Sequence, residues 1–257
     1  MSRNLLTGLV GAWCPSLGPS GYALLDRSGR GNHGTLTNMD AGSDWVGTPG
    51  GWALDYDGTN DYVNCGTSRQ LQPAECSYFA WIKPNATQSG TYNQIMGWDS
   101  GNSFTSVSTL LLKSNLKLAF YVSGGPYGSY DGNGSITLSA GVWQCVVVTM
   151  NAQASVGYVD AKVDLSVSGG TATGTSGSFW IGAQNNYPRA YTGQIADAAV
   201  WSRSLTATEV RQLYQLGQGG LGRLLTQRAQ RRVFRTQAAV KSYLFLNRGQ
   251  VIGGGTL

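Results

Sequence analysis

Short apolar runs punctuated by glycine dominate the sequence and limit what it can fold into. The chain holds 37 glycines in 257 residues, and many of the runs between them alternate apolar with polar side chains. Alternation with a period of two places one face of a strand against a core, and glycine supplies tight turns. About a dozen such runs at hairpin-sized spacing predict an all-β fold of two stacked antiparallel sheets, a jelly-roll sandwich. The clearest runs are residues 9–14, 52–58, 61–66, 76–84, 91–98, 108–113, 116–122, 135–139, 142–150, 154–160, 177–183 and 193–201.

Charge is distributed unevenly along the chain. Residues 218–257 contain seven basic residues and no acidic one, whereas residues 1–217 carry a net charge of −2 and the whole chain +5. This contrast predicts a sandwich domain at residues 1–217 and a basic C-terminal extension at residues 218–257. Such an extension indicates docking on an acidic surface of protein, nucleic acid or lipid, and the alternative is a tail that only improves solubility. Its basic residues are Arg223, Arg228, Arg231, Arg232, Arg235, Lys241 and Arg248.

One short helix is predicted at residues 204–217. Thr206 and Glu209 have the spacing of a capping box, and Gly217 can end the helix in a left-handed conformation. Further along, residues 239–257 have a strand-like centre. We expect that segment to pair with another chain, which would also close a homo-oligomer.

The four cysteines and the N-terminal residues indicate the cellular compartment in which the chain is made and the redox state of its thiols. Cys14, Cys65, Cys76 and Cys145 have no metal-ligand spacing, and residues 1–13 lack the long apolar run of a signal peptide. We therefore expect cytoplasmic synthesis and reduced cysteines that serve as small core residues. No stretch of the sequence reaches the roughly 18 to 20 apolar residues of a membrane span.

Several sequence blocks in a fixed order resemble the laminin-G-like family, whose fold is the concanavalin A-type jelly roll. The resemblance extends from about residue 8 to residue 217, and it implies the fold more than the function, because this superfamily includes lectins, glycan-binding modules, laminarinase-type hydrolases and adhesive domains. The blocks are GLVGAW at 8–13, DRSGRGNHGTLTN at 26–38, ALDYDGTNDYVNCG at 53–66, FAWIKP at 79–84, YVDAKVD at 158–164 and GQIADAAVWSRSLTATEVRQLY at 193–214.

His33 is the single histidine of the chain, and it lies in the second of these blocks. The resemblance implies that this block is a structural turn, in which glycines supply positive φ angles while Asp26 and Asn32 bond the backbone. A catalytic histidine needs an oriented nucleophile or carboxylate partner, and the spacing implies none. We expect His33 to be a scaffold residue.

The acidic residues do not form the pattern of a glycan hydrolase. Hydrolysis requires a general acid and a second carboxylate, and the hydrolytic relatives place them on one strand in an E-x-D-x-x-E-like run. This chain has two glutamates, Glu75 and Glu209, and the aspartate pairs Asp55/Asp57 and Asp160/Asp164 lie at expected strand ends. We expect no catalytic residues and no enzyme.

The resemblance also implies a structural Ca²⁺ in many relatives, held in part by an aspartate of the last strand. Here that stretch reads GQIADAAVW, with Ala196 at the aspartate's position and Asp197 beside it. Neighbouring strand residues face opposite sides. We therefore predict that Asp197 points away and that calcium is absent or weakly held, with no other cofactor and no metal site.

Three expected loops combine aromatic rings with amides and carboxylates, as sugar sites do. The alternative for each tyrosine is a partly exposed turn residue. The three loops carry one arginine and no lysine, so nucleic-acid binding by the body is not expected, although the tail leaves it open. The candidate glycan-binding residues are Trp98, Asp99, Tyr127, Tyr130, Asp131, Asn185, Asn186, Tyr187 and Arg189.

Two functions follow from these features. The first is a non-enzymatic structural or adhesion protein whose basic arm attaches a glycan-binding-type jelly roll to a protein of a larger assembly. This combination is similar to virion proteins of tailed bacteriophages, such as capsid decorations, head fibres or tail-fibre components, and implies a virion location. The second is a stand-alone soluble lectin, and a degenerate glycanase is a remote third.

Overall fold

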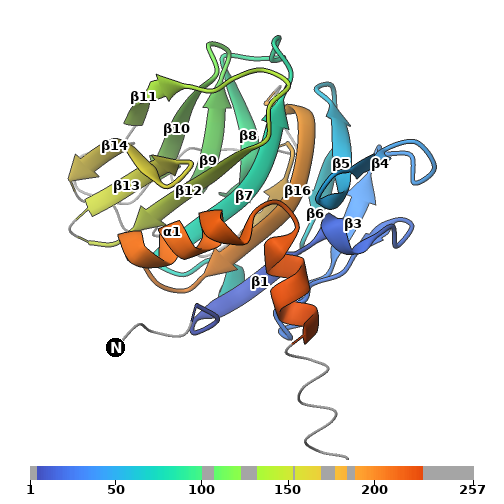
Figure 1. Ribbon diagram of the computed structural model, residues 1–257, viewed down its shortest axis with the longest axis horizontal. Helices are drawn as coiled ribbons and strands as arrows, with labels where there is room; N and C mark the ends of the chain where they lie inside the picture. Colours follow the sequence, from blue (N-terminus) through green and yellow to red (C-terminus); the bar gives the residue numbers. More distant parts are fainter. Residues whose placement is uncertain are drawn as a thin grey trace, which may run out of the picture. The chain divides into compact units, whose positions relative to one another are not determined.

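The computed structural model describes residues 5–99, 107–122, 132–152, 154–168, 177–183 and 189–227. The chain divides into two compact units, Met1–Gly222 and Arg223–Leu257. The first unit is a sandwich of two antiparallel sheets (Figure 1), so the predicted all-β fold is confirmed. Within the described residues, no helix has the length and apolar character needed to cross a membrane.

Sheet A has eight strands in the order β14-β13-β12-β7-β16-β5-β4, with β1 also paired to β16. Its strands are β1 (Leu9–Trp13), β4 (Trp45–Thr48), β5 (Gly51–Asp57), β7 (Cys76–Pro84), β12 (Gln144–Met150), β13 (Ala154–Val159), β14 (Lys162–Ser168) and β16 (Thr192–Trp201).

Sheet B also has eight strands, in the order β11-β10-β9-β8-β15-β6-β3-β2. Its strands are β2 (Ala23–Leu24), β3 (Gly34–Thr37), β6 (Tyr62–Asn64), β8 (Tyr92–Asp99), β9 (Val107–Lys113), β10 (Lys117–Val122), β11 (Gly132–Thr137) and β15 (Ser178–Ile181). Two short 3-10 helices, η1 (Pro15–Leu17) and η2 (Arg69–Leu71), connect strands.

Strand β16 holds sheet A together because it lies inside the sheet and changes partner halfway along. One of its edges pairs with β7, while residues 192–195 of the other edge pair with β5 and residues 198–201 pair with β1. A register shift lies between Ile195 and Ala198, which both belong to the core cluster. Two residues instead of one therefore separate successive core positions, and the strict alternation assumed for Asp197 does not hold there.

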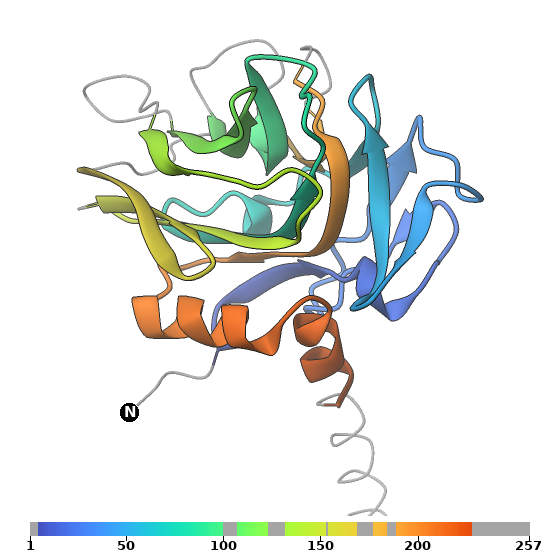
Figure 2. The same ribbon diagram turned by 45° about the horizontal axis from the view of Figure 1, so that its top comes forward.

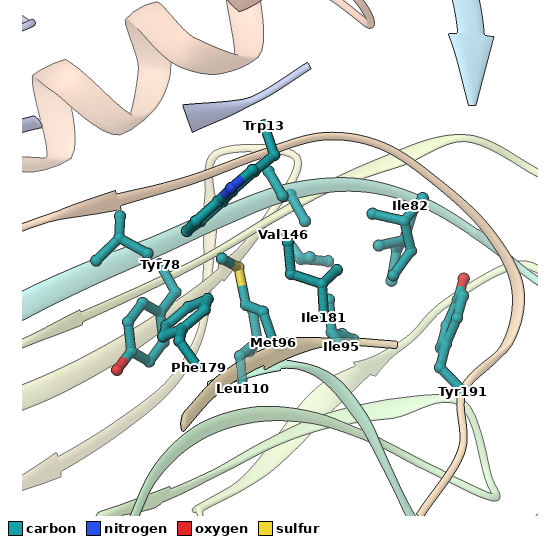
Figure 3. Packing of buried hydrophobic residues seen from close by; sticks show 14 of the residues in the cluster. Trp13, Tyr78, Ile82, Ile95, Met96, Leu110, Val146, Phe179, Ile181 and Tyr191 are labelled. Atoms are coloured by element: carbon teal, nitrogen blue, oxygen red, sulfur yellow. The ribbon is translucent and has the colours of Figure 1, made fainter. Parts of the chain in front are cut away.

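The core lies between the two sheets (Figure 3). Trp13 of β1 stacks on Phe179 of β15 with ring centroids 5.3 Å apart, and Tyr78 of β7 meets Phe179 edge-on at 5.8 Å. Such aromatic pairs contribute about 0.5–1.5 kcal/mol beyond the area they bury. These contacts join sheet A to sheet B.

The predicted helix is α1 (Ala207–Leu216), and its capping box is confirmed. The Thr206 hydroxyl accepts from the Glu209 amide, and a Glu209 carboxylate oxygen accepts from the Thr206 amide at 2.9 Å. Arg203 forms a bidentate ion pair with the same carboxylate. The hydrogen bonds from Arg203 hold the pKa of Glu209 below its usual range. The helix therefore begins at a fully bonded carboxylate.

Helix α1 covers the face of sheet A that points away from sheet B (Figure 2). Val210 and Leu213 are fully buried, and Tyr214 stacks on Trp81 of β7 with centroids 6.1 Å apart. Sheet A is thus buried on both faces along β7, which explains why that strand reads as a nearly continuous apolar run.

All four cysteines are free and buried, as expected from the sequence. Burial raises the pKa of each thiol, and that of Cys76 reaches about 12. Because the thiolate is the reactive form of cysteine, these side chains are inert parts of the core.

The turn at residues 26–38 is built around Asp26. Its carboxylate accepts four hydrogen bonds, from the amides of Ala12, Ser28 and Asn32 and from the Ser28 hydroxyl, at 2.8–3.0 Å. The Nδ1 atom of His33, an exposed side chain, accepts from the Asp26 amide at 3.0 Å. His33 therefore bonds the backbone of the turn, which agrees with its predicted scaffold role.

The Asp26→Ala variant is expected to lose about 3 kcal/mol or more of unfolding free energy, since three amides lose a charged acceptor and Asp26 is buried. The matched variant His33→Ala should lose about 1 kcal/mol, because it removes one bond from an exposed side chain. Urea unfolding measures both. Equal losses would contradict this account of the turn.

Candidate functional site

A row of paired residues crosses the outer face of sheet B. Residues directly opposite each other in an antiparallel pair point to the same face. The strand neighbours of the row, among them Val63, Phe179 and Leu110, belong to the core, so the row faces away from sheet A. In order across the sheet, the row is Thr35 (β3), Asn64 (β6), Trp180 (β15), Gly97 (β8), Thr109 (β9) and Tyr121 (β10).

The row has one aromatic residue on either side of Gly97 and Thr109. Trp180 and Tyr121 are three strand spacings apart, about 14 Å, with Gly97 and Thr109 between them. A Cβ added at Gly97 would lie 2.7 Å from the Thr109 Cγ2 atom and closer still to the Ser108 carbonyl oxygen. Glycine is therefore required at this position, because β9 packs directly against it.

Exposure rises from the centre of the row toward its ends. Thr109 is 0% and Trp180 4% exposed, Asn64 and Tyr121 are half-buried, and Thr35 is exposed. The described helices do not cover this face, because α1 packs on sheet A (Figure 2). The accessible members of the row are Thr35, Asn64 and Tyr121, and their hydroxyl, amide and aromatic groups are of the types that bind carbohydrate.

Carboxylates are scarce near the row. Asp99, at the end of β8, is the single acidic residue in the eight strands of sheet B. The Asp160 carboxylate accepts from the Cys145 amide in a turn, and the Asp164 carboxylate accepts from the Ile136 amide and ties β14 to β11. In the described strands of sheet B, no second carboxylate is present to form a hydrolytic pair.

Asp55, Asp57 and Asp61 lie where β5 turns toward β6. The Asp61 carboxylate accepts from the Asp57 amide at 3.0 Å, and the Asp57 carboxylate accepts from the Thr59 amide. Burial raises the pKa of Asp61 to about 6 and also raises the pKa of Asp55. The Asp57 and Asp61 carboxylates thus bond the backbone of a tight turn, which agrees with the turn role that the sequence indicated.

The residues at the position of the family's calcium site do not fit the ion. Ala196 offers no side-chain oxygen, and the buried Asp197 carboxylate accepts from the Ser16 hydroxyl and from the Gly222 amide. Within the part of the chain that the structure describes, no group of three His, Cys, Asp or Glu side chains can hold a metal ion. Asp197 instead fixes η1 and the residues that follow α1.

The residues predicted to bind a glycan do not meet at one described place. Trp98 was expected in a loop, but β8 continues to Asp99 and the Trp98 side chain is fully buried in the core. It therefore offers no ring face to a sugar. Asp99 pairs with Ser178 at the end of the sheet, and the Arg189 carbonyl oxygen accepts from the Gln94 amide beside the row.

Other predicted positions lie outside the described residues, and their assignment stays a prediction. Arg223 is described and exposed. The positions outside the description are Tyr127, Tyr130, Asp131, Asn185, Asn186, Tyr187, Arg228, Arg231, Arg232, Arg235, Lys241 and Arg248.

Sequence reasoning missed the row because its members come from six separate strands. Only the alternation of side chains along β15 indicates that Trp180 faces away from the core, since both of its neighbours, Phe179 and Ile181, are apolar core residues. Nothing in the sequence shows that it lies opposite Gly97, because register depends on pairing across the sheet.

Residues 57–211 match the Laminin_G_3 family, and the chain belongs to the concanavalin A-like lectin/glucanases superfamily. The predicted resemblance to this fold family is confirmed. No curated protein sequence matches the chain.

Solved structures share the fold at low sequence identity. Domain 4 of AbnA, a GH43 extracellular arabinanase from Geobacillus stearothermophilus, in complex with arabinotriose, aligns with a TM-score of 0.63 and 18% identity over 80% of this chain and 98% of that chain. The binding domain of Paraclostridial Mosquitocidal Protein 1 aligns with a TM-score of 0.63 and 15% sequence identity, over 82% of this chain and 52% of that chain. Trypanosoma rangeli sialidase aligns with a TM-score of 0.60 and 17% sequence identity, over 82% of this chain and 33% of that chain. The chain thus spans about half of the mosquitocidal binding-domain chain and a third of the sialidase.

The Asp61→Asn variant is expected to raise the melting temperature at about pH 8 by a few degrees and to leave it nearly unchanged at about pH 4. The folded-state pKa of about 6 lies above the ordinary value of about 3.9, so the fold favours the protonated carboxyl. That contribution is complete below about pH 4 and is lost as the pH rises through about 6.

Thermal unfolding at both pH values measures this difference. The exposed Glu75→Gln is the matched control and should give no pH-dependent gain. A lower melting temperature for Asp61→Asn at the higher pH would show that the ionised carboxylate stabilises the turn.

Proposed function

We propose that the protein is a non-catalytic carbohydrate-binding protein of the adhesion type, attached to a larger assembly by its basic C-terminal segment. The observation that carries the binding role is the match of residues 57–211 to the concanavalin A-like lectin/glucanases superfamily, together with the accessible part of the row on sheet B, which is Thr35, Asn64 and Tyr121. Aromatic faces pack against the C–H face of a sugar, and neutral polar groups bond its hydroxyls.

Two comparisons support this role. The arabinanase domain with the same fold holds arabinotriose, and the mosquitocidal protein's domain is named a binding domain. At identities of 18% and 15% these similarities concern the fold. They supply a first test ligand, arabinotriose, rather than an identified glycan.

The absence of catalysis in this proposal rests on the carboxylates. A glycosidase with two carboxylates needs them flanking the scissile bond, roughly 5–9.5 Å apart. Asp99 stands alone in the strands of sheet B, and Asp26 and Glu209 are already fully bonded in the turn and the helix cap.

The binding role predicts signals on a glycan array without hydrolysis. Incubation with arabinotriose and with laminarin should release no new reducing ends, as measured by a reducing-sugar assay. The matched variant Asp99→Asn should behave like the unchanged protein. If the unchanged protein releases reducing ends and Asp99→Asn does not, the non-catalytic role is wrong. If no glycan of the array binds, the binding role is wrong.

The attachment role concerns the segment after α1. The Gln218 side-chain amide donates to the Thr48 hydroxyl, and the Gly222 backbone amide donates to the Asp197 carboxylate. Leu221 is 1% exposed, so residues 218–222 belong to the sandwich unit. The basic segment proper therefore starts at Arg223. We propose that it docks on an acidic protein surface of an assembly, and that this assembly is a tailed-phage virion.

Truncation separates folding from attachment. A chain of residues 1–222 should keep the melting temperature of the full chain, whereas a chain of residues 1–217 should lose several degrees because the buried Asp197 loses an N–H donor. In density gradients of particles from the source organism, the full chain should sediment with them and the 1–222 chain should not. Co-sedimentation of the 1–222 chain would contradict the attachment role, and capsid or portal genes beside the coding gene would support a virion.

A further inference from the structure

The half of sheet B that consists of β15, β6, β3 and β2 carries no charged side chain in its strands. Strands β8, β9 and β10 in the other half carry Asp99, Lys113 and Lys117. Charged residues normally occupy solvent-facing positions, and their depletion beside aromatic residues is typical of a binding surface. The uncharged half therefore differs from an ordinary solvated sheet face.

Four side chains form an accessible patch on the outer face of this half. Thr35 of β3 pairs with Asn64 of β6, and Thr37 of β3 pairs with Tyr62 of β6. The residues between them on both strands belong to the core, so the four side chains point away from sheet A. Thr35 is exposed and the other three are half-buried. Strand geometry places them about 5 Å apart across the strands and about 7 Å apart along them, an area that one sugar ring covers. We call these four residues the β3–β6 patch.

The Asn64 side chain is held in place and keeps a free donor. Its Oδ1 atom accepts from the Gly66 backbone amide at 2.9 Å, which fixes the orientation of the side-chain amide. Among the described residues, no acceptor bonds its Nδ2 atom. Just beyond β3, by contrast, the Nδ2 atom of Asn38 donates to the Asn60 carbonyl oxygen at 2.9 Å. Because the Asn64 amide is already oriented, an oxygen of a ligand can bind its donor at a small cost in side-chain entropy.

The groups of the patch select a neutral, hydroxyl-rich ligand. An amide nitrogen donates, and the hydroxyls of threonine and tyrosine both donate and accept, as do the hydroxyls of a sugar. The ring of Tyr62 is a surface for the C–H face of a sugar. An ionic ligand group would gain no ion pair from these four strands.

The same face offers little to a protein partner. The large apolar side chains that are exposed in the described part of the chain all lie outside β2, β3, β6 and β15. Protein interfaces are held mainly by large side chains buried at their centre. The accessible groups of the patch are small and polar apart from Tyr62, which favours a sugar over a protein.

We propose that Thr35, Thr37, Tyr62 and Asn64 form the subsite that binds one neutral sugar unit of a glycan. The sugar packs on the Tyr62 ring and accepts a hydrogen bond from Asn64 Nδ2, and the two threonines bond its hydroxyls. This inference rests on the proposed carbohydrate-binding function and names its site and ligand class.

The first test uses the full chain and the Asn64→Asp variant, which keeps the oxygen that accepts from Gly66 and removes the free donor. Asn38→Asp is the matched control, because it adds the same charge near β3 but outside the patch. The probes are arabinotriose and the methyl glycosides of arabinose, galactose, glucose and mannose, titrated by calorimetry. At least one should bind, and Asn64→Asp should weaken its affinity about tenfold or more, the loss of one good hydrogen bond. Asn38→Asp should leave the affinity unchanged.

The second test removes the ring. Tyr62→Ala should weaken the affinity for the same probe about threefold or more, since a sugar face loses its aromatic contact. Trp52→Ala is the matched control, because Trp52 is 39% exposed and lies on β5 of sheet A. Circular dichroism of each ligand-free variant establishes that it is folded. If Tyr62→Ala does not fold, Asn64→Asp, which keeps its turn bond, decides the question.

The outcomes separate this site from the function on which it rests. Binding of a probe or an array glycan that neither Asn64→Asp nor Tyr62→Ala weakens would overturn the site and leave the carbohydrate-binding function standing. Equal losses in Asn64→Asp and Asn38→Asp would also overturn it, because the added charge rather than the lost donor would then weaken binding. Absence of binding to every probe and every array glycan would overturn both.

Discussion

The in-register pairing of β15, β8 and β9 is the constraint on which the rest of the account depends. Because side chains alternate along a strand, a residue can face the ligand side only if its neighbours are held in the core. Phe179 does this for Trp180 by stacking on Trp13, and Leu110 does it for Thr109. A slip of one residue would exchange the core for the candidate site, so burial on the inner face fixes the chemistry of the outer face.

Local signals explain why much of the fold was predictable. The capping box of Thr206 and Glu209, the turn around Asp26 and the alternating strands each depend on residues close in sequence, and all three are present in the structure. The error at Trp98 has the same origin. Trp98 was expected to belong to a ligand-binding loop, whereas β8 continues to Asp99 and the Trp98 side chain is buried in the core.

The candidate site was not predictable, because it is a product of pairing between distant segments. Thr109 and Trp180 stand on either side of Gly97, and neither lies in a motif. The same holds for Asp197, whose orientation depends on a register shift in β16 against β7. Alternation predicts faces only where the pairing is regular, and bulges are common where a strand changes partner or meets a functional surface.

Asp197 also fixes the last residues of the sandwich unit, which directly precede the basic segment. Its carboxylate accepts from the Gly222 amide, in the first turn of the helical residues 220–227, where the helix dipole favours a negative charge. The last residue of the sandwich unit is therefore bonded to β16 of sheet A.

A crystal structure of the full chain with the array glycan that binds best tests the central claim most directly. The account predicts electron density for a sugar on the outer face of sheet B, in contact with Asn64 or Tyr121. Density for the glycan elsewhere on the protein would contradict it.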